Sequence, residues 1–268
     1  MVPRFRSLAS GLAAAALSAA AARAGLGEPC ESLRDPDAVR AVVVTAGEED
    51  PRTLAQIAAL GANMIVTVTE PRASTGAAAS AAGLGYLPQV STQDVERLVT
   101  DAAWRDHLRA VPGLTGFHYL DEGVLEGYAS PATQARTYGI LKAFFPWAMV
   151  IYATRLDPVA TDPGFLDAYF RPEYTDFVAP YFYPVGNTVL GPQGSDDPWE
   201  ARLEALLEPL AARTPSGKPV LPVIQTFEQT GFPVTPSLPE RQLVVYRRIW
   251  PAQRGSRRSG GAGRSTGS

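Results

Sequence analysis

The stretch Thr115-Gly-Phe-His-Tyr-Leu-Asp121 is a short, mainly apolar run that predicts a buried β-strand. A helix-like segment, 131–145, follows it, and a second apolar run, 148–153, comes next. This order of strand, helix and strand is typical of a crossover unit in a parallel sheet. The unit therefore predicts an α/β fold.

The same alternation extends in both directions along the chain. We expect strands at 41–45, 63–69, 85–90, 115–121, 148–153, 177–183 and 220–227. The segments between and after them are expected as helices at 51–60, 92–111, 131–145, 198–212 and 239–250, with an Ala-rich segment at 77–82. The strand runs are almost continuously apolar, as in strands covered on both faces. Pro88, Pro180 and Pro222 predict bulges or irregular strand ends, because proline removes a ladder donor.

Two architectures share this alternation, the doubly wound open sheet and the TIM barrel. The open sheet usually carries a Gly-rich phosphate loop after its first strand, whereas segment 45–50 is acidic. The length of 268 residues suits one barrel, which typically has roughly 250. We therefore predict a (β/α)8-type TIM barrel domain over residues 25–251.

The sequence after the last predicted helix lacks an eighth apolar run. Residues 252–268 contain no large apolar side chain, so we expect a disordered tail and an incomplete barrel whose eighth strand is missing. Strands one and seven would then keep unpaired edges, which favour aggregation, and a truncated, non-functional remnant is one interpretation. A basic tail that binds an acidic partner is the alternative.

The N-terminus has the pattern of a signal peptide over residues 1–24. Arg4 and Arg6 precede an apolar stretch at 8–22, and Ala22-Arg23-Ala24 is a small-x-small cleavage site. The stretch is short for a membrane span, although an uncleaved anchor is the alternative. We expect a secreted or periplasmic protein without stable membrane insertion after cleavage.

Composition excludes several classes of function. The net charge of −3 gives no indication of a nucleic-acid partner, and Cys30, the single cysteine, permits no internal disulfide. Lysines occur only at 142, on a predicted helix, and at 218, before a predicted strand, so a Schiff-base lysine in the barrel mouth is not expected. Two histidines are too few for a metal-dependent amidohydrolase. No metal or organic cofactor is implied.

In a barrel, catalytic residues lie at the carboxyl ends of the strands. Residues there that we expect to contact substrate are Glu70, Gln89, His118, Tyr152, Arg155, Tyr181, Tyr183 and Gln225. A core position is the alternative for His118, and an ion pair with Asp157 is the alternative for Arg155. The mouth also holds Asp121, Glu122 and Glu228, for which solvated loop positions are the alternative. Carboxylates and aromatic rings suit the cleavage of glycosidic bonds.

The segment Gly116-Phe-His-Tyr-Leu-Asp-Glu-Gly123 resembles the strand-four signature of glycoside hydrolase superfamily barrels. Clan A of that superfamily carries its acid/base Glu at the end of strand four and its nucleophile at the end of strand seven. The resemblance implies that Glu122 is the acid/base and Glu228 the nucleophile. Asp121 stands where clan A usually has Asn, and its charge would raise the pKa of its neighbour. Strand alternation turns Glu228 inward only if the strand ends or bulges before it.

The resemblance implies an exported glycoside hydrolase-like protein that acts on a poly- or oligosaccharide. A retaining mechanism would place the carboxyl groups of Glu122 and Glu228 about 5 Å apart. A catalytically silent barrel that binds glycan through aromatic side chains is the alternative from another class. The sugar, the linkage and the oligomeric state are not specified by the sequence.

Overall fold

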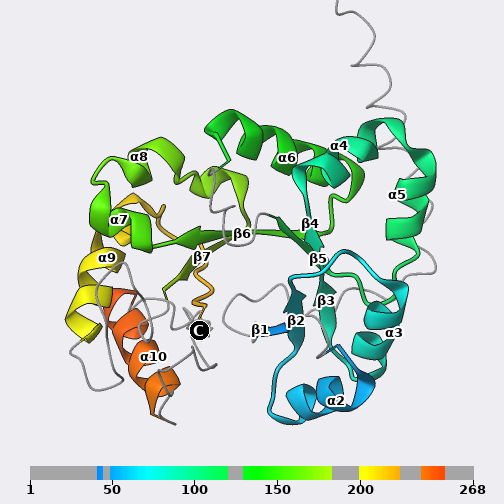
Figure 1. Ribbon diagram of the computed structural model, residues 1–268, viewed down its shortest axis with the longest axis horizontal. Helices are drawn as coiled ribbons and strands as arrows, with labels where there is room; N and C mark the ends of the chain where they lie inside the picture. The colour runs from blue at the N-terminus through cyan, green and yellow to red at the C-terminus, as the bar shows by residue number, and fades with distance from the viewer. Residues whose placement is uncertain (1–40, 45–48, 120–128, 183–198, 224–236, 251–268) are drawn as a thin grey trace, which may run out of the picture.

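The computed structural model describes residues 41–44, 49–119, 129–182, 199–223 and 237–250 (Figure 1). The strands are β1 (Ala41–Val44), β2 (Met64–Thr67), β3 (Gly85–Leu87), β4 (Gln89–Val90), β5 (Gly116–Tyr119), β6 (Met149–Arg155) and β7 (Phe177–Tyr181). The longer helices are α2 (Pro51–Ala59), α3 (Ala73–Ala81), α4 (Thr92–Thr100), α5 (Ala102–Arg109), α6 (Pro131–Phe144), α9 (Trp199–Arg213) and α10 (Leu238–Ile249). Three short helices, α7 (Asp157–Thr161), α8 (Phe165–Tyr169) and η5 (Pro172–Tyr174), lie between β6 and β7.

All strand pairs are parallel and follow chain order. One sheet has the order β1-β2-β3 and the other β4-β5-β6-β7. Pro88, which has no N–H to donate, separates β3 from β4, as the sequence predicted for a proline inside a strand run. Tyr86 in β3 nevertheless bonds to the chain just before β5, since its N–H donates to the Gly113 carbonyl (2.9 Å). The two sheets therefore continue into one another around β5.

The array of strands extends past β7 at residues 219–223. Val220 and Val223 form parallel bridges to Val178 and Tyr181, so this run lies beside β7 and extends the array beyond it. Residues 224–227 of the predicted strand lie outside the described residues. Within the described part of the chain, no strand pairing joins the 219–223 run to β1. The described residues thus form an α/β fold with parallel sheets that do not close among themselves, and barrel closure stays a prediction.

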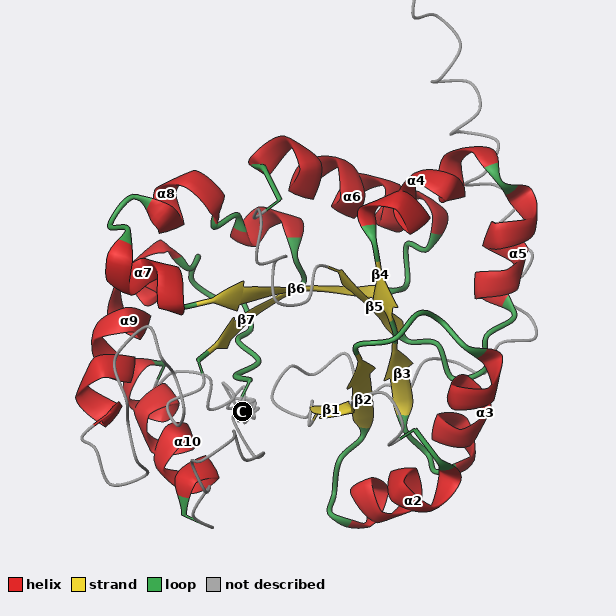
Figure 2. Cartoon of the chain, viewed as in Figure 1, coloured by secondary structure: helices red, strands yellow, loops and turns green. Residues whose placement is uncertain are grey.

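The sheets curve, and the helices lie along the outside of the arc (Figures 1 and 2). On the inner side, one apolar cluster joins Met64 and Leu87 to Ile151, Phe177 and Leu221. Side chains from β2 and from the far end of the array meet there, which requires the sheets to bend towards each other. We call the side that carries these residues the concave face. Separate apolar clusters fill the space between the sheets and the helices on the outer side.

Capping residues explain where several helices begin. Asp50 accepts hydrogen bonds from the N–H groups of Arg52 and Thr53 (2.9 and 3.1 Å) at the start of α2. Ser91 and Asp94 form a reciprocal capping box at the start of α4. Asp101 ends α4 and caps α5 by accepting from the Trp104 N–H (2.9 Å). The single helix predicted over 92–111 is therefore wrong, because Asp101 divides it in two.

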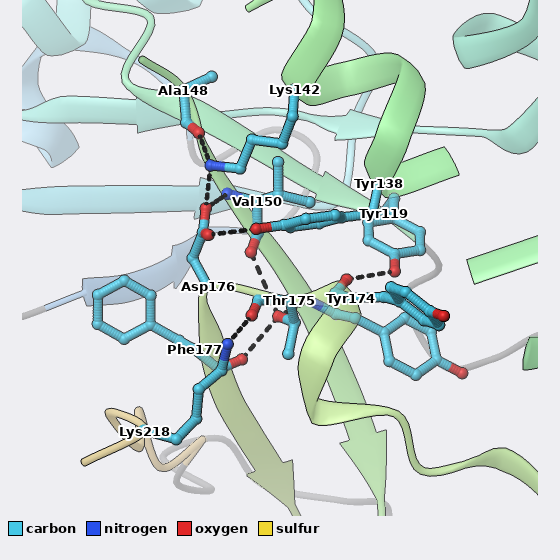
Figure 3. Close-up of polar contacts among 11 residues, drawn as sticks. Tyr119, Tyr138, Lys142, Ala148, Val150, Tyr174, Thr175, Asp176, Phe177 and Lys218 are labelled. Atoms are coloured by element: carbon cyan, nitrogen blue, oxygen red, sulfur yellow. Dashed lines mark hydrogen bonds and ion pairs between the residues drawn. The ribbon is translucent and has the colours of Figure 1, made fainter. Parts of the chain in front are cut away.

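A polar network ties α6 to the amino ends of β6 and β7 (Figure 3). The Asp176 carboxylate accepts from the Tyr138 hydroxyl (2.9 Å), the Lys142 ammonium (2.5 Å) and the Val150 N–H (2.8 Å). The Lys218 ammonium donates to the carbonyl of Thr175, next to Asp176. Both lysines of the chain thus lie at the amino ends of the strands, opposite the end where the sequence predicts chemistry. Burial lowers the pKa of Lys218.

Candidate active site

Side chains on β5 alternate between the two faces of the sheet. Phe117 and Tyr119 pack in the outer cluster beneath α4 and α6, together with Val90 of β4. His118, between the two aromatic residues, therefore faces the concave side. Gln89 precedes Val90 and is the register partner of His118, so the two polar residues lie side by side on the concave face.

His118 is a buried polar side chain on this face. The residue is 4% exposed, and its Nδ1 atom has no hydrogen-bond partner among the described residues. Burial lowers the pKa of His118 to about 4, so the ring is neutral near pH 7. A neutral imidazole has one donor and one acceptor nitrogen, which matches a hydroxyl group.

The strands beside His118 carry small side chains towards their carboxyl ends. In register, His118 pairs with Ile151, and Ile151 pairs with Phe177. The next pair on the same face is Ala153 and Ala179. Next to Ile151 and Phe177 the concave face thus bears the methyl groups of Ala153 and Ala179, and Arg155 and Tyr181 follow as the last register pair of the two strands.

Tyr181 and Arg155 end their strands as register partners. Tyr181 shares the face of Phe177 and Ala179 and is 4% exposed, so it belongs to the concave face. The Arg155 guanidinium donates from Nε to the Asp157 carboxylate at 2.6 Å. This pair realises the alternative expected for Arg155. Its role in substrate binding stays a prediction.

Tyr152 lies on the other side of β6. Its ring packs against Tyr119, with 5.2 Å between ring centroids, in the cluster between sheet and helices. The Tyr119 hydroxyl donates to the Tyr174 carbonyl (2.9 Å), which links β5 to η5. The structure does not bring Tyr152 together with Gln89 and His118, and it gives the residue a packing position.

The connections after β1 and β2 meet at a nearly buried carboxylate that the predicted site residues did not include. Glu49, whose side chain is 8% exposed, accepts from the hydroxyls of Thr69 and Thr75 and pairs with Arg72 at 3.4 Å. Glu70, predicted as a substrate contact, follows Thr69 and is exposed. Glu49 holds the two connections together. Its place in the acidic segment 45–50, after the first predicted strand, was the available signal.

The proposed catalytic groups lie outside the described residues. These are Asp121, Glu122 and Glu228, and the predicted substrate contacts Tyr183 and Gln225 also lie there. Within the described ranges, no three His, Cys, Asp or Glu side chains gather in a way that could hold a metal ion. None of the helices described there has the length and apolar character needed to cross a membrane.

Comparisons with known proteins give distant structural likenesses only. No protein-family model and no curated protein sequence matches the chain. A GH2 β-galacturonidase from Eisenbergiella tayi bound to galacturonate aligns at 15% identity and a TM-score of 0.45, covering 80% of this chain and 41% of that one. A β-glucuronidase from Bacteroides uniformis aligns at 13% identity and a TM-score of 0.45, covering 75% of this chain and 26% of that one. The chain spans less than half the length of these proteins. Likenesses at this level decide neither its fold family nor its activity.

Proposed function

We propose that the protein is an exported glycoside hydrolase-like protein that acts on O-glycosidic bonds of a poly- or oligosaccharide. One observation carries the proposal. Gln89 and His118 present neutral polar groups side by side on the concave face, and Nδ1 of His118 has no partner among the described residues. Sugar hydroxyls are the complementary groups, since each both donates and accepts a hydrogen bond.

The sequence places carboxylates after β5 and after the run at 219–223. Asp121 and Glu122 follow the end of β5 at Tyr119, and Glu228 follows the run at 219–223. In this proposal Glu122 protonates the leaving oxygen and later activates water, while Glu228 attacks the anomeric carbon. A covalent glycosyl-enzyme then forms as the aglycone leaves, and water releases the sugar with retained configuration.

The assignment of both carboxylates is tested by azide rescue on a panel of 2,4-dinitrophenyl glycosides. This leaving group needs no protonation, so Glu122→Ala should form the glycosyl-enzyme and give, with azide, a glycosyl azide of the substrate's own configuration. Glu228→Ala should lose activity and regain it with azide, which displaces dinitrophenolate and inverts the configuration. Glu96→Ala, which removes an exposed partner of Arg136 on α4, is the control and should keep full activity.

The outcomes separate the proposal from its alternative. Saccharide binding by the unmodified protein without hydrolysis of any glycoside would indicate a catalytically silent glycan-binding protein. Hydrolysis that survives in both Glu variants without azide would exclude the two assigned carboxylates.

A further inference from the structure

We infer that a groove between α9 and the short helices α7 and α8, on the outer side of the fold, binds a free fatty acid or a similar single-chain anionic amphiphile. This site goes beyond the proposed function and is independent of it, because it lies on the helices rather than on the concave face. Three properties of the groove support the assignment: its volume, its apolar floor and the sign of its charges.

The groove is large enough for a small molecule. Figure 1 shows α7 and α8 next to α9 at one end of the array of strands. The groove between them has a volume of about 450 Å³, within the range of roughly 300–1,000 Å³ that is typical of ligand sites. Seven of the nine residues that line it are apolar. Its main character is therefore that of a site for a hydrocarbon chain.

Small side chains above an apolar floor keep the groove open. Leu166 of α8 and Leu206 of α9 are 2% and 6% exposed and belong to the outer apolar cluster. Ala160 of α7 and Ala205 of α9 line the exposed rim, where each contributes a single methyl group. Apolar surface is thus left in contact with water along the groove. An alkyl chain that lies there removes this surface from water, which is the main source of affinity for an apolar ligand.

The two charged residues that line the groove are both arginines. Arg202 and Arg213 lie on the same face of α9, roughly 16 Å apart along the helix axis. Among the described residues that line the groove there is no Asp or Glu. A cation at each end of an apolar surface complements an anionic head group and repels a cationic one. The expected ligand therefore combines an apolar chain with an anion.

Arg213 is the end at which we place the anionic head group. Its Nε atom donates to the Asp167 carboxylate at 2.7 Å, and its Nη1 atom donates to the Pro209 carbonyl at 3.0 Å. A guanidinium has five N–H donors, so Arg213 has the capacity to bind a second carboxylate. The Asp167 side chain is 69% exposed, and exposed ion pairs of this kind contribute little to stability. An incoming carboxylate can therefore join or replace Asp167 at small cost.

The experiment uses the full chain and three amphiphiles that share one alkyl chain and differ in the head group. Decanoate, decyl sulfate and decyltrimethylammonium are titrated below their critical micelle concentrations. We expect both anions to bind at least about tenfold more tightly than the cation. In methyl NMR spectra the anions should shift the signals of Val159, Leu166 and Leu206, which line the groove, and leave those of Met64 and Leu87 on the concave face in place.

Filling the groove tests its position. Ala205→Trp introduces a large ring at an exposed position that lines the groove, and it should weaken decanoate binding at least about tenfold. Ala55→Trp makes the same substitution at an exposed position of α2 and should leave the decanoate affinity unchanged. Circular dichroism of both variants verifies folding.

Removing the positive charge tests the place of the head group. Arg213→Gln should weaken decanoate binding about fivefold and should not weaken binding of decyltrimethylammonium. Arg247→Gln removes an exposed arginine of α10 that does not line the groove, and it should bind decanoate like the unmodified protein.

Equal affinities for decanoate and decyltrimethylammonium would overturn the inference, because the arginines would then not select the ligand. Equal decanoate affinities of folded Ala205→Trp and Ala55→Trp would also overturn it, since the amphiphile would bind elsewhere. Failure of both anions to bind would exclude a fatty-acid site and leave the groove to a protein partner. None of these results bears on Glu122 and Glu228, so the proposed function is tested separately.

Discussion

His118 links the stability of the protein to pH. Its pKa is about 4 in the folded state and near 6.5 when the ring is exposed to water, so between these values the unfolded chain binds a proton that the folded chain does not. The stability that the neutral ring contributes is complete above pH 6.5 and is lost as pH falls towards 4. We expect this group alone to cost about 3 kcal/mol over that range.

Urea denaturation between pH 4 and 7.5 measures the effect. The free energy of unfolding of the unmodified protein should fall with decreasing pH more steeply than that of His118→Phe, which has no titrating ring. His107→Gln alters the other histidine, which is exposed on α5, and should follow the unmodified profile. Parallel profiles for His118→Phe and the unmodified protein would show that His118 is not buried in this way.

Substitution by alanine is expected to have opposite effects on stability at two glycines. A Cβ atom at Gly116 would overlap the Met149 carbonyl group on the neighbouring strand, so Gly116→Ala should destabilise the protein by about 2 kcal/mol or more. A Cβ at Gly139 would meet nothing within 4 Å, and that residue lies inside α6. Gly139→Ala should therefore stabilise by about 0.5–1 kcal/mol. Thermal unfolding of both variants measures these effects. Similar melting temperatures for Gly116→Ala and Gly139→Ala would contradict the close approach of β5 and β6.

At the scale of elements, Asp176 joins one helix to two strands. Asp176→Ala leaves the Tyr138 hydroxyl, the Lys142 ammonium and the Val150 N–H without their acceptor. Hydrogen bonds to a charged group contribute roughly 1.5–3 kcal/mol each. The side chains of Lys142 and Asp176 are 27% and 25% exposed, which weakens their pairing, so we expect a loss of about 3 kcal/mol.

Asp167→Ala is the matched control for this loss. Asp167 pairs with Arg213 at 2.7 Å, but 69% of its side chain is exposed. The substitution should change the free energy of unfolding by less than about 1 kcal/mol. If chemical denaturation gave equal losses for Asp176→Ala and Asp167→Ala, α6 would not be anchored through Asp176.

The helices show which elements the sequence could specify. The predicted helices 51–60 and 131–145 end within a residue of α2 and α6, because Asp50 and Ser130 mark their starts and Pro51 and Pro131 occupy the first turn. The helices α7 and α8 were not predicted. Each has five residues, which is too short for a recognisable apolar period, and their packing around Phe165 and Leu166 depends on contacts with α9.

At the scale of the molecule, the alternation of apolar runs and helical segments was enough to predict parallel strands in chain order. Register could not be predicted in this way, although it decides which side chains share a face. It places Gln89 beside His118 and turns Tyr152 outward, towards Tyr119. The separation of Glu122 from Glu228 depends on contacts between segments more than a hundred residues apart, which local patterns do not encode.

The most direct test of the proposed function is therefore the crystallographic distance between the carboxyl groups of Glu122 and Glu228. The retaining mechanism predicts about 5 Å, with both groups at the carboxyl ends of the strands on the side of Gln89 and His118. A distance beyond about 10 Å, or a Glu228 side chain directed away from the concave face, would contradict a two-carboxylate glycosidase.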